Sequence, residues 1–149
     1  MISGGLLQMF GLGVLIIGDS GVGKSESALE LIARGHRFVS DDVVHVWKTA
    51  GGRIIGKAPK LSRFFMEIRG LGIINIKEIF GPRSICSQAP IDLVIRLKNG
   101  TGNRNMTGSG SGSPRITLSL GREFLSSTFP WRRAGTSPRS WRSPARSTF

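Results

Sequence analysis

The stretch that decides the fold class is Gly18-Asp19-Ser20-Gly21-Val22-Gly23-Lys24-Ser25. It matches the pattern G-x-x-x-x-G-K-[ST], follows the apolar run at residues 14–17 and precedes an amphipathic segment at residues 25–34. A strand, a glycine-rich loop and a helix in this order are the context that a phosphate-binding loop requires. The sequence therefore predicts an α/β domain with a nucleotide-binding site at residues 18–25.

Each residue type in this loop suits phosphate chemistry. The glycines let the backbone curl so that successive N–H groups converge on a β-phosphate, and the helix adds its positive dipole end. Lys24 is expected to neutralise the β- and γ-phosphates, and the Ser25 hydroxyl to bind the Mg²⁺ that bridges them. A glycine-rich turn without a ligand would leave the Lys-Ser pair unexplained. The loop therefore predicts ATP and Mg²⁺ as cofactors.

Two acidic residues extend the site toward catalysis. Asp41 and Asp42 interrupt an apolar segment between residues 38–40 and 43–47. A parallel sheet would bring the ends of such strands next to the phosphates, where one carboxylate can accept a proton from an attacking hydroxyl. The alternative is a solvated turn between two strands.

Strand signals continue up to about residue 98. Residues 50–52 form a turn into an apolar run at 53–56, so we expect a hairpin with the strand at 43–47. Residues 91–97 are the last strand candidate. We expect residues 1–98 to form one partial α/β domain and residues 99–149 to be a separate tail.

The tail differs sharply in composition. Of its 51 residues, 27 are Gly, Ser, Thr or Pro, so it has too few apolar residues to offset the entropy of ordering. We expect a disordered or misfolded low-complexity tail. It also carries a net charge of +7 of the +12 total, from 8 basic and 1 acidic residues. Net charge therefore says little about the function of the domain.

Composition excludes several classes of protein. No apolar run approaches the roughly 18 residues needed to cross a bilayer, so we expect no membrane partner. The single Cys86 rules out an internal disulfide, and no basic region precedes the apolar N-terminal residues. We expect a cytoplasmic protein.

Three blocks together carry a family resemblance. GDSGVGKSE, ALELIARGHRFVSDD and EIRGLGII occur in the order and spacing of bacterial HPr kinase/phosphorylase, which residues 6–98 closely resemble. The resemblance implies a P-loop kinase domain of the phosphoenolpyruvate-carboxykinase-like type in a cytoplasmic homohexamer. It implies an enzyme that phosphorylates a serine of HPr, the phosphocarrier of the sugar phosphotransferase system, with ATP. The same enzyme removes the phosphate with inorganic phosphate, giving pyrophosphate.

The resemblance also assigns roles to residues. It implies that Lys24 is catalytic, that Asp42 is the acid/base residue, and that Ser25 and Glu67 bind Mg²⁺. Arg69 is expected to contact phosphoryl oxygens, the alternative being a surface salt bridge. The other signature positions are Asp41, Gly70 and Gly72, the two glycines having a plain turn as their alternative.

The chain departs from the family pattern in three places. Ser3 stands where the family has an active-site histidine, and we expect the N-terminal domain of the family to be missing. After Lys98 neither the catalytic arginine nor the helical C-terminus of the family is visible. If each codon takes the last base of one residue and the first two bases of the next, the tail permits EWDREQEYDRL from Lys98 to Gly108. In the same frame, Phe129 to Phe149 permits PVAPGRNISAIVEVAREINF. We infer a frameshift near Lys98 and expect an inactive or crippled fragment.

Two other functions compete with this interpretation. A nucleic-acid-binding protein would use the positive charge together with Trp131-Arg132-Arg133 and Trp141-Arg142, since these side chains can contact phosphates and stack on bases. No recognisable binding module surrounds them, so we expect no nucleic-acid partner. Another P-loop kinase, acting on a small metabolite, would leave the EIRGLGII block unexplained.

Overall fold

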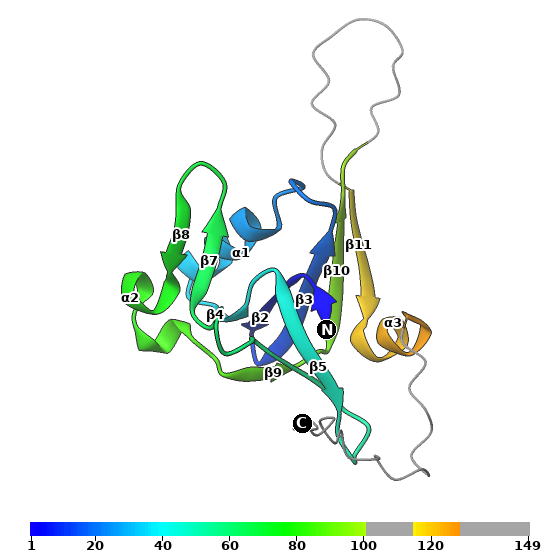
Figure 1. Cartoon of the computed structure of the whole chain (residues 1–149). Helices are drawn as coiled ribbons and strands as arrows, with labels where there is room; N and C mark the ends of the chain where they lie inside the picture. Colours follow the sequence, from blue (N-terminus) through cyan, green and yellow to red (C-terminus); the bar gives the residue numbers. More distant parts are fainter. Residues whose placement is uncertain (101–114, 129–149) are drawn as a thin grey trace, which may run out of the picture.

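A computed structural model describes residues 1–100 and 115–128 of the chain (Figure 1). Its centre is a five-stranded mixed sheet in the order β11-β10-β3-β2-β4. The parallel pair is β3 (Leu12–Gly18) and β10 (Leu93–Lys98), while β2 (Gly5–Met9) runs antiparallel to both β3 and β4 (Arg37–Ser40). Because β2 opposes both neighbours, β3 and β4 point the same way and end at the same edge.

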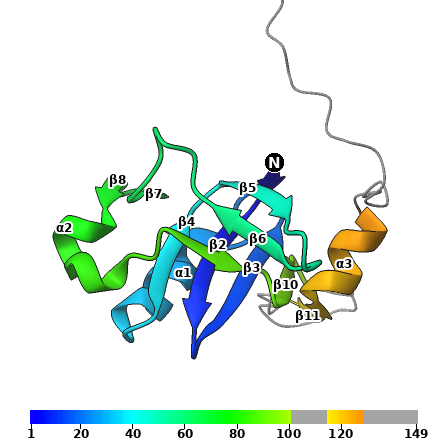
Figure 2. The same cartoon turned by 90° about the horizontal axis from the view of Figure 1, so that it is seen from below.

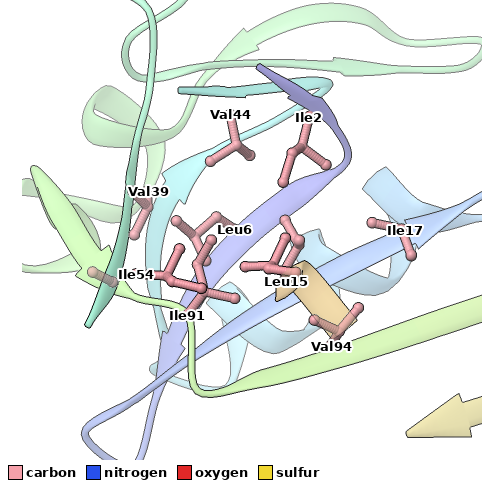
Figure 3. Packing of buried hydrophobic residues seen from close by; sticks show 11 residues of the cluster. Ile2, Leu6, Leu15, Ile17, Val39, Val44, Ile54, Ile91 and Val94 are labelled. Carbon is pink, nitrogen blue, oxygen red and sulfur yellow. The ribbon is translucent and has the colours of Figure 1, made fainter. Parts of the chain in front are cut away.

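A second sheet packs against one face of the first (Figure 2). It has the order β1-β5-β6-β9, with β1 (Ile2–Ser3), β5 (Val43–Lys48), β6 (Ile54–Lys57) and β9 (Gln88–Pro90) all antiparallel. The side chains between the sheets point toward one another, and Leu6, Leu15 and Val44 among them are fully buried (Figure 3). Burial on this scale supplies the main driving force for folding.

The opposite face of the central sheet carries α1 (Lys24–Ala33) and a hairpin of β7 (Phe65–Ile68) and β8 (Gly72–Asn75). The short helix α2 (Ile76–Phe80) and a 3₁₀ turn (Pro82–Ser84) follow the hairpin. Ala28 and Ile32 of α1 pack with Met66 and Ile68 of β7 in a second buried cluster. This cluster fixes the hairpin beside the start of α1.

Several expected elements are present. The run at 14–17 lies in β3, the helix expected at 25–34 is α1, and β5 and β6 form the expected hairpin. The expected last strand is β10. The sheet itself is mixed rather than purely parallel, because β2 inserts between β3 and β4. Within the described residues, no helix is long and apolar enough to cross a membrane.

The expectation of a wholly disordered tail is wrong for residues 115–128. They form β11 (Arg115–Leu120), which pairs with β10, and α3 (Gly121–Thr128), whose Leu125 is fully buried in the cluster between the sheets. Pairing with an existing strand edge satisfies backbone groups that a local composition count ignores. Residues 101–114 and 129–149 of the predicted tail, including Trp131 and Trp141, lie outside the described residues.

Candidate phosphate-transfer site

The glycine-rich loop joins the end of β3 to the first turn of α1. Gly21 and Gly23 have φ angles of 77° and 97°, in the left-handed region that L side chains rarely adopt, and Gly23 is the N-cap of α1. The helix begins at Lys24, so its free N–H groups and positive dipole end face the loop. The loop therefore has the backbone shape of an anion site.

The side chain of Lys24 folds back onto this loop. Its Nζ donates hydrogen bonds of 2.8 Å to the backbone carbonyl oxygens of both Gly18 and Asp19. The ammonium group is thus held inside the curl of the loop, where phosphate oxygens can replace the two carbonyls as its partners.

Asp41 lies directly against the loop serine. The Ser25 hydroxyl is 3.1 Å from each carboxylate oxygen of Asp41, and only 7% of Asp41 is exposed. Burial raises the pKa of the Asp41 carboxyl above its usual value, and hydrogen bonds from Ser25 and from the backbone N–H groups of Glu67 and Asp42 partly oppose this. The buried Asp41 carboxylate and the Ser25 hydroxyl together offer oxygen ligands for a cation.

Asp42 occupies an unusual backbone conformation. Its φ of 65° is left-handed, and its carbonyl oxygen accepts a 2.9 Å hydrogen bond from the N–H of Gly4. Such conformations cost free energy and cluster at functional sites. The neighbouring Ser3 pairs with Val43 across β1 and β5, so the position of the missing family histidine lies beside Asp42.

The β7–β8 hairpin forms the opposite wall. In Figure 1 its tip and the loop between β3 and α1 point toward the same end of the molecule. The Arg69 guanidinium lies against the loop at Gly21. A Cβ atom added at Gly21 would stand only 3.1 Å from Nη2 of Arg69. Among the described residues the one ion pair joins Glu30 to Arg34, so the salt-bridge alternative for Arg69 finds no partner there.

These walls enclose one open cavity of about 680 Å³. Most of the expected site residues line it, and they are Gly18, Ser20, Gly21, Gly23, Lys24, Ser25, Asp41, Asp42, Glu67, Arg69, Gly70 and Gly72. Asp19 and Val22 do not. Ser3, which stands where the resemblance predicts a histidine, also lines it. So do Glu26, Ile68 and Leu71, to which sequence reasoning gave no individual role. The sequence did contain a signal for Leu71, because an apolar residue between two glycines marks the exposed tip of a hairpin.

The donor set suits a magnesium ion. Ser25, Asp41 and Glu67 offer a hydroxyl and two carboxylates on one cavity, and the described residues contain no group of three or more His, Cys, Asp or Glu that could hold a metal. Mg²⁺ is usually bound by only one or two carboxylates, with substrate phosphates and water completing its shell. The residues present therefore fit a metal that a nucleotide brings with it.

Comparisons with known proteins find chains similar to this one. The family model for the HPr Serine kinase C-terminal domain matches residues 1–116. The chain is 52% identical to the HPr kinase/phosphorylase of Lachnoclostridium phytofermentans over 97 residues, which are 65% of this chain and 31% of that protein. It is 44% identical to that of Lactiplantibacillus plantarum over 111 residues, 74% and 35% of the two chains. The chain thus spans about a third of the length of these relatives.

A solved structure is similar as well. The Hpr(Ser) kinase/phosphatase from Coxiella burnetii superposes with a TM-score of 0.64 at 31% identity. The match covers 72% of this chain and 64% of that one.

Proposed function

Because the chain belongs to the family of the HPr serine kinase C-terminal domain, we propose that it binds ATP with Mg²⁺ for phosphoryl transfer to a serine of HPr. In the reverse direction the same site uses inorganic phosphate and releases pyrophosphate. One observation carries this proposal: Lys24, Ser25, Asp42 and Glu67 converge on a single cavity from three separate parts of the chain.

Nucleotide binding rests on the loop and on the hairpin facing it. The N–H groups of the loop and of the first turn of α1 receive the phosphates, and Lys24 exchanges its carbonyl partners for phosphate oxygens. Arg69, already placed against Gly21, adds a second positive charge from the other wall. Phosphoryl transfer depends mainly on such positioning and charge stabilisation.

Ser25 and Glu67 would hold the Mg²⁺, with Asp41 beside Ser25 as a further oxygen ligand. When bound, the ion supplies neutralisation of the charge that develops on the phosphate oxygens. The Ser25 hydroxyl would turn from the Asp41 carboxylate toward the metal, and the buried carboxylate gains a cationic partner.

Asp42 is the acid/base residue in this proposal. Its carboxylate takes the proton from the acceptor serine as the oxygen of that serine attacks the γ-phosphorus and ADP leaves. In the reverse reaction Asp42 returns a proton to the serine oxygen as inorganic phosphate attacks. The strained backbone at Asp42 is held by its hydrogen bond with Gly4. This contact fixes the position from which the Asp42 side chain extends.

We also propose a kinship with the phosphoenolpyruvate-carboxykinase-like P-loop kinases, a hexameric assembly and a cytoplasmic location, all three on the family resemblance. The tail beyond Lys98 stays in our proposal a product of a shifted reading frame. Five of the relatives match over 97 residues, about the length that precedes the departure, while the family model runs on to residue 116. Sequencing the gene across codons 95–105 tests this, and an intact frame with synonymous variation among relatives would contradict it.

The direct test is made with the whole chain. We expect saturable binding of Mg·ATP, weakened about 30-fold in Lys24→Ala because a charged hydrogen-bonding group is lost. Phosphoserine formation on HPr, followed by mass spectrometry, should be several powers of ten slower than with the full-length Lachnoclostridium phytofermentans relative. Failure to bind Mg·ATP would overturn the proposed function, and turnover equal to the relative would refute the crippled site.

A further inference from the structure

The cavity at the glycine-rich loop is lined by more acidic than basic side chains. The basic ones are Lys24 and Arg69, and the acidic ones are Glu26, Asp41, Asp42 and Glu67. A cavity that receives phosphates would bind them better with the opposite balance, since like charges repel. In the proposed function Asp41 and Glu67 face the cation and Asp42 carries the proton. Glu26 is the acidic side chain that the proposed reaction does not use.

Glu26 lies where the helix meets the glycine-rich loop. It belongs to the first turn of α1, and its Oε2 would stand 4.0 Å from a Cβ atom added at Gly23, the N-cap of that helix. The carboxylate therefore bends back toward the loop, and its side chain is exposed at the cavity. Among the described residues the one ion pair joins Glu30 to Arg34, so no basic side chain there pairs with Glu26.

A carboxylate in this place acts differently in the empty and in the occupied site. In the empty site the free N–H groups and the positive end of the helix dipole stabilise Glu26. Phosphates that enter the loop bind the same N–H groups, and the nearby carboxylate repels them. Free ATP carries about twice the negative charge of Mg·ATP, so Glu26 repels the free nucleotide about twice as strongly.

We propose that Glu26 makes the site select the magnesium complex of the nucleotide over the free nucleotide. This inference rests on the proposed function and adds a specificity-determining residue to the same site. Lys24 and Arg69 attract the free nucleotide more strongly than the complex, because it carries more charge, and Glu26 offsets this preference. A glutamate that only stabilised the helix would affect both forms of the nucleotide alike. A glutamate that bound the metal would strengthen binding of the complex alone.

The test makes the same change at two positions of α1. Glu26→Gln removes the charge beside the loop, and Glu30→Gln removes one from the next turn, where the side chain is 65% exposed and does not line the cavity. The dissociation constant of ATP is measured on the whole chain, once with excess Mg²⁺ and once with a chelator that removes it. We expect Glu26→Gln to bind Mg·ATP about threefold and free ATP about tenfold more tightly, because doubling the repulsion squares its effect on the binding constant. Glu30→Gln should bind both forms as the unaltered chain does.

Two further measurements identify charge as the cause. Glu26→Asp keeps the negative charge, so its affinity for free ATP should stay within about twofold of that of the unaltered chain. Repeating the titrations at about 0.5 M salt should shrink the advantage of Glu26→Gln, because salt screens the repulsion between exposed charges.

The other outcomes each contradict the role of Glu26. Equal gains for the two forms of ATP would make it a helix-stabilising residue, and weaker binding of Mg·ATP alone would make it a metal ligand. No change in Glu26→Gln, or the same gains in Glu30→Gln, would also overturn the proposal. If Glu26→Asp behaves as Glu26→Gln does, shape rather than charge decides and the proposal is wrong. If the unaltered chain binds neither form, the proposed function itself fails and the role of Glu26 with it.

Discussion

The strand β10 has two neighbours that are held in place in different ways. On one side β3 runs parallel to it and is buried on both faces, with Val14 and Ile16 toward α1 and Leu15 and Ile17 toward the second sheet. On the other side β11 pairs antiparallel over six residues, yet all of them except the half-buried Ser119 are exposed. Backbone pairing is similar on the two sides, so side-chain burial must make the difference in stability.

This contrast also distinguishes the strands that carry the candidate site, β3 and β4, from the edge strand β11. The phosphate loop and Asp41 and Asp42 follow β3 and β4, strands whose positions both clusters fix. Apart from the pairing of β11 with β10, the segment β11–α3 is anchored to the rest of the described chain through Leu125, Phe124 and Gly121. A site that needs precise geometry is thus built on the doubly buried side of the sheet.

The largest expected effect tests this contrast with two leucines of the same cluster. Leu15 and Leu125 are both fully buried, in β3 and α3. Leu15→Ala should lower the free energy of unfolding by about 3–4 kcal/mol, since the core around β3 cannot relax into the space left. Leu125→Ala should cost less, about 2 kcal/mol, because α3 can detach locally.

Urea unfolding measures the two losses, and hydrogen exchange locates them. Faster exchange confined to β11 and α3 in Leu125→Ala is the expected pattern. Equal losses with exchange rising throughout the chain would show that α3 belongs to the same cooperative unit as β3.

The next effect uses two glycines that lie against backbone carbonyls. A Cβ atom at Gly13 of β3 would stand 1.4 Å from the Pro90 oxygen, and one at Gly121 of α3 would stand 2.2 Å from the Ile91 oxygen. Both alanine variants must shift backbone, which commonly costs 1–3 kcal/mol, and we expect about 3 for Gly13→Ala and about 1 for Gly121→Ala.

The exposed Ser126→Ala in α3 serves as the control and should change stability by less than about 0.5 kcal/mol. Thermal unfolding of the three variants gives the comparison. A Gly121→Ala variant as damaged as Gly13→Ala would mean that α3 cannot move away from Ile91.

How far the sequence predicted this structure depends on the kind of signal. β3, α1, the β5–β6 hairpin and β10 have apolar runs bounded by glycines or charges, and these patterns suffice. β2 escaped prediction because Gln8, Gly5 and the preceding Gly4 weaken its apolar pattern. β11 and α3 were missed because other parts of the chain hold them: β11 pairs with β10, and Leu125 of α3 is buried in the cluster between the sheets. Local composition does not show either contact.

The site shows the same division. The loop and the two aspartates were predicted from local residues and from the resemblance, and the cavity brings them together. The contact of Arg69 with Gly21 joins segments 48 residues apart, so no spacing could predict it. The burial of Asp41 likewise depends on how the β7–β8 hairpin packs.

A smaller effect concerns Asp41, because burial of its carboxyl group on the well-packed side of the molecule lowers the free energy of unfolding. Between the ordinary aspartate pKa of 3.8 and the raised pKa of Asp41, the folded chain binds more protons than the unfolded chain. The free energy of unfolding therefore falls as pH rises through this window. Asp41→Asn removes the titration, so its melting temperature should gain on that of the unaltered chain as the pH rises from 3.8 through this window.

The difference between the two melting curves, followed in steps of pH without Mg²⁺, checks the sign. A difference that stays constant with pH, or that moves against Asp41→Asn, would show that burial does not govern the Asp41 carboxyl.

The smallest expected effect lies on β11 itself. Leu118 is 67% exposed, and threonine suits a strand, so Leu118→Thr should change the free energy of unfolding by less than about 0.5 kcal/mol. On the adjacent β10, Val94 is 1% exposed, and Val94→Thr places a hydroxyl in the core at a cost of about 1–2 kcal/mol. Urea unfolding of the two variants compares the effect of an introduced threonine on two paired strands. A loss at Leu118 as large as that at Val94 would mean that something covers the outer face of β11 in solution. Side-chain burial would then hold both β3 and β11 against β10, and these two strands would differ only in what covers them.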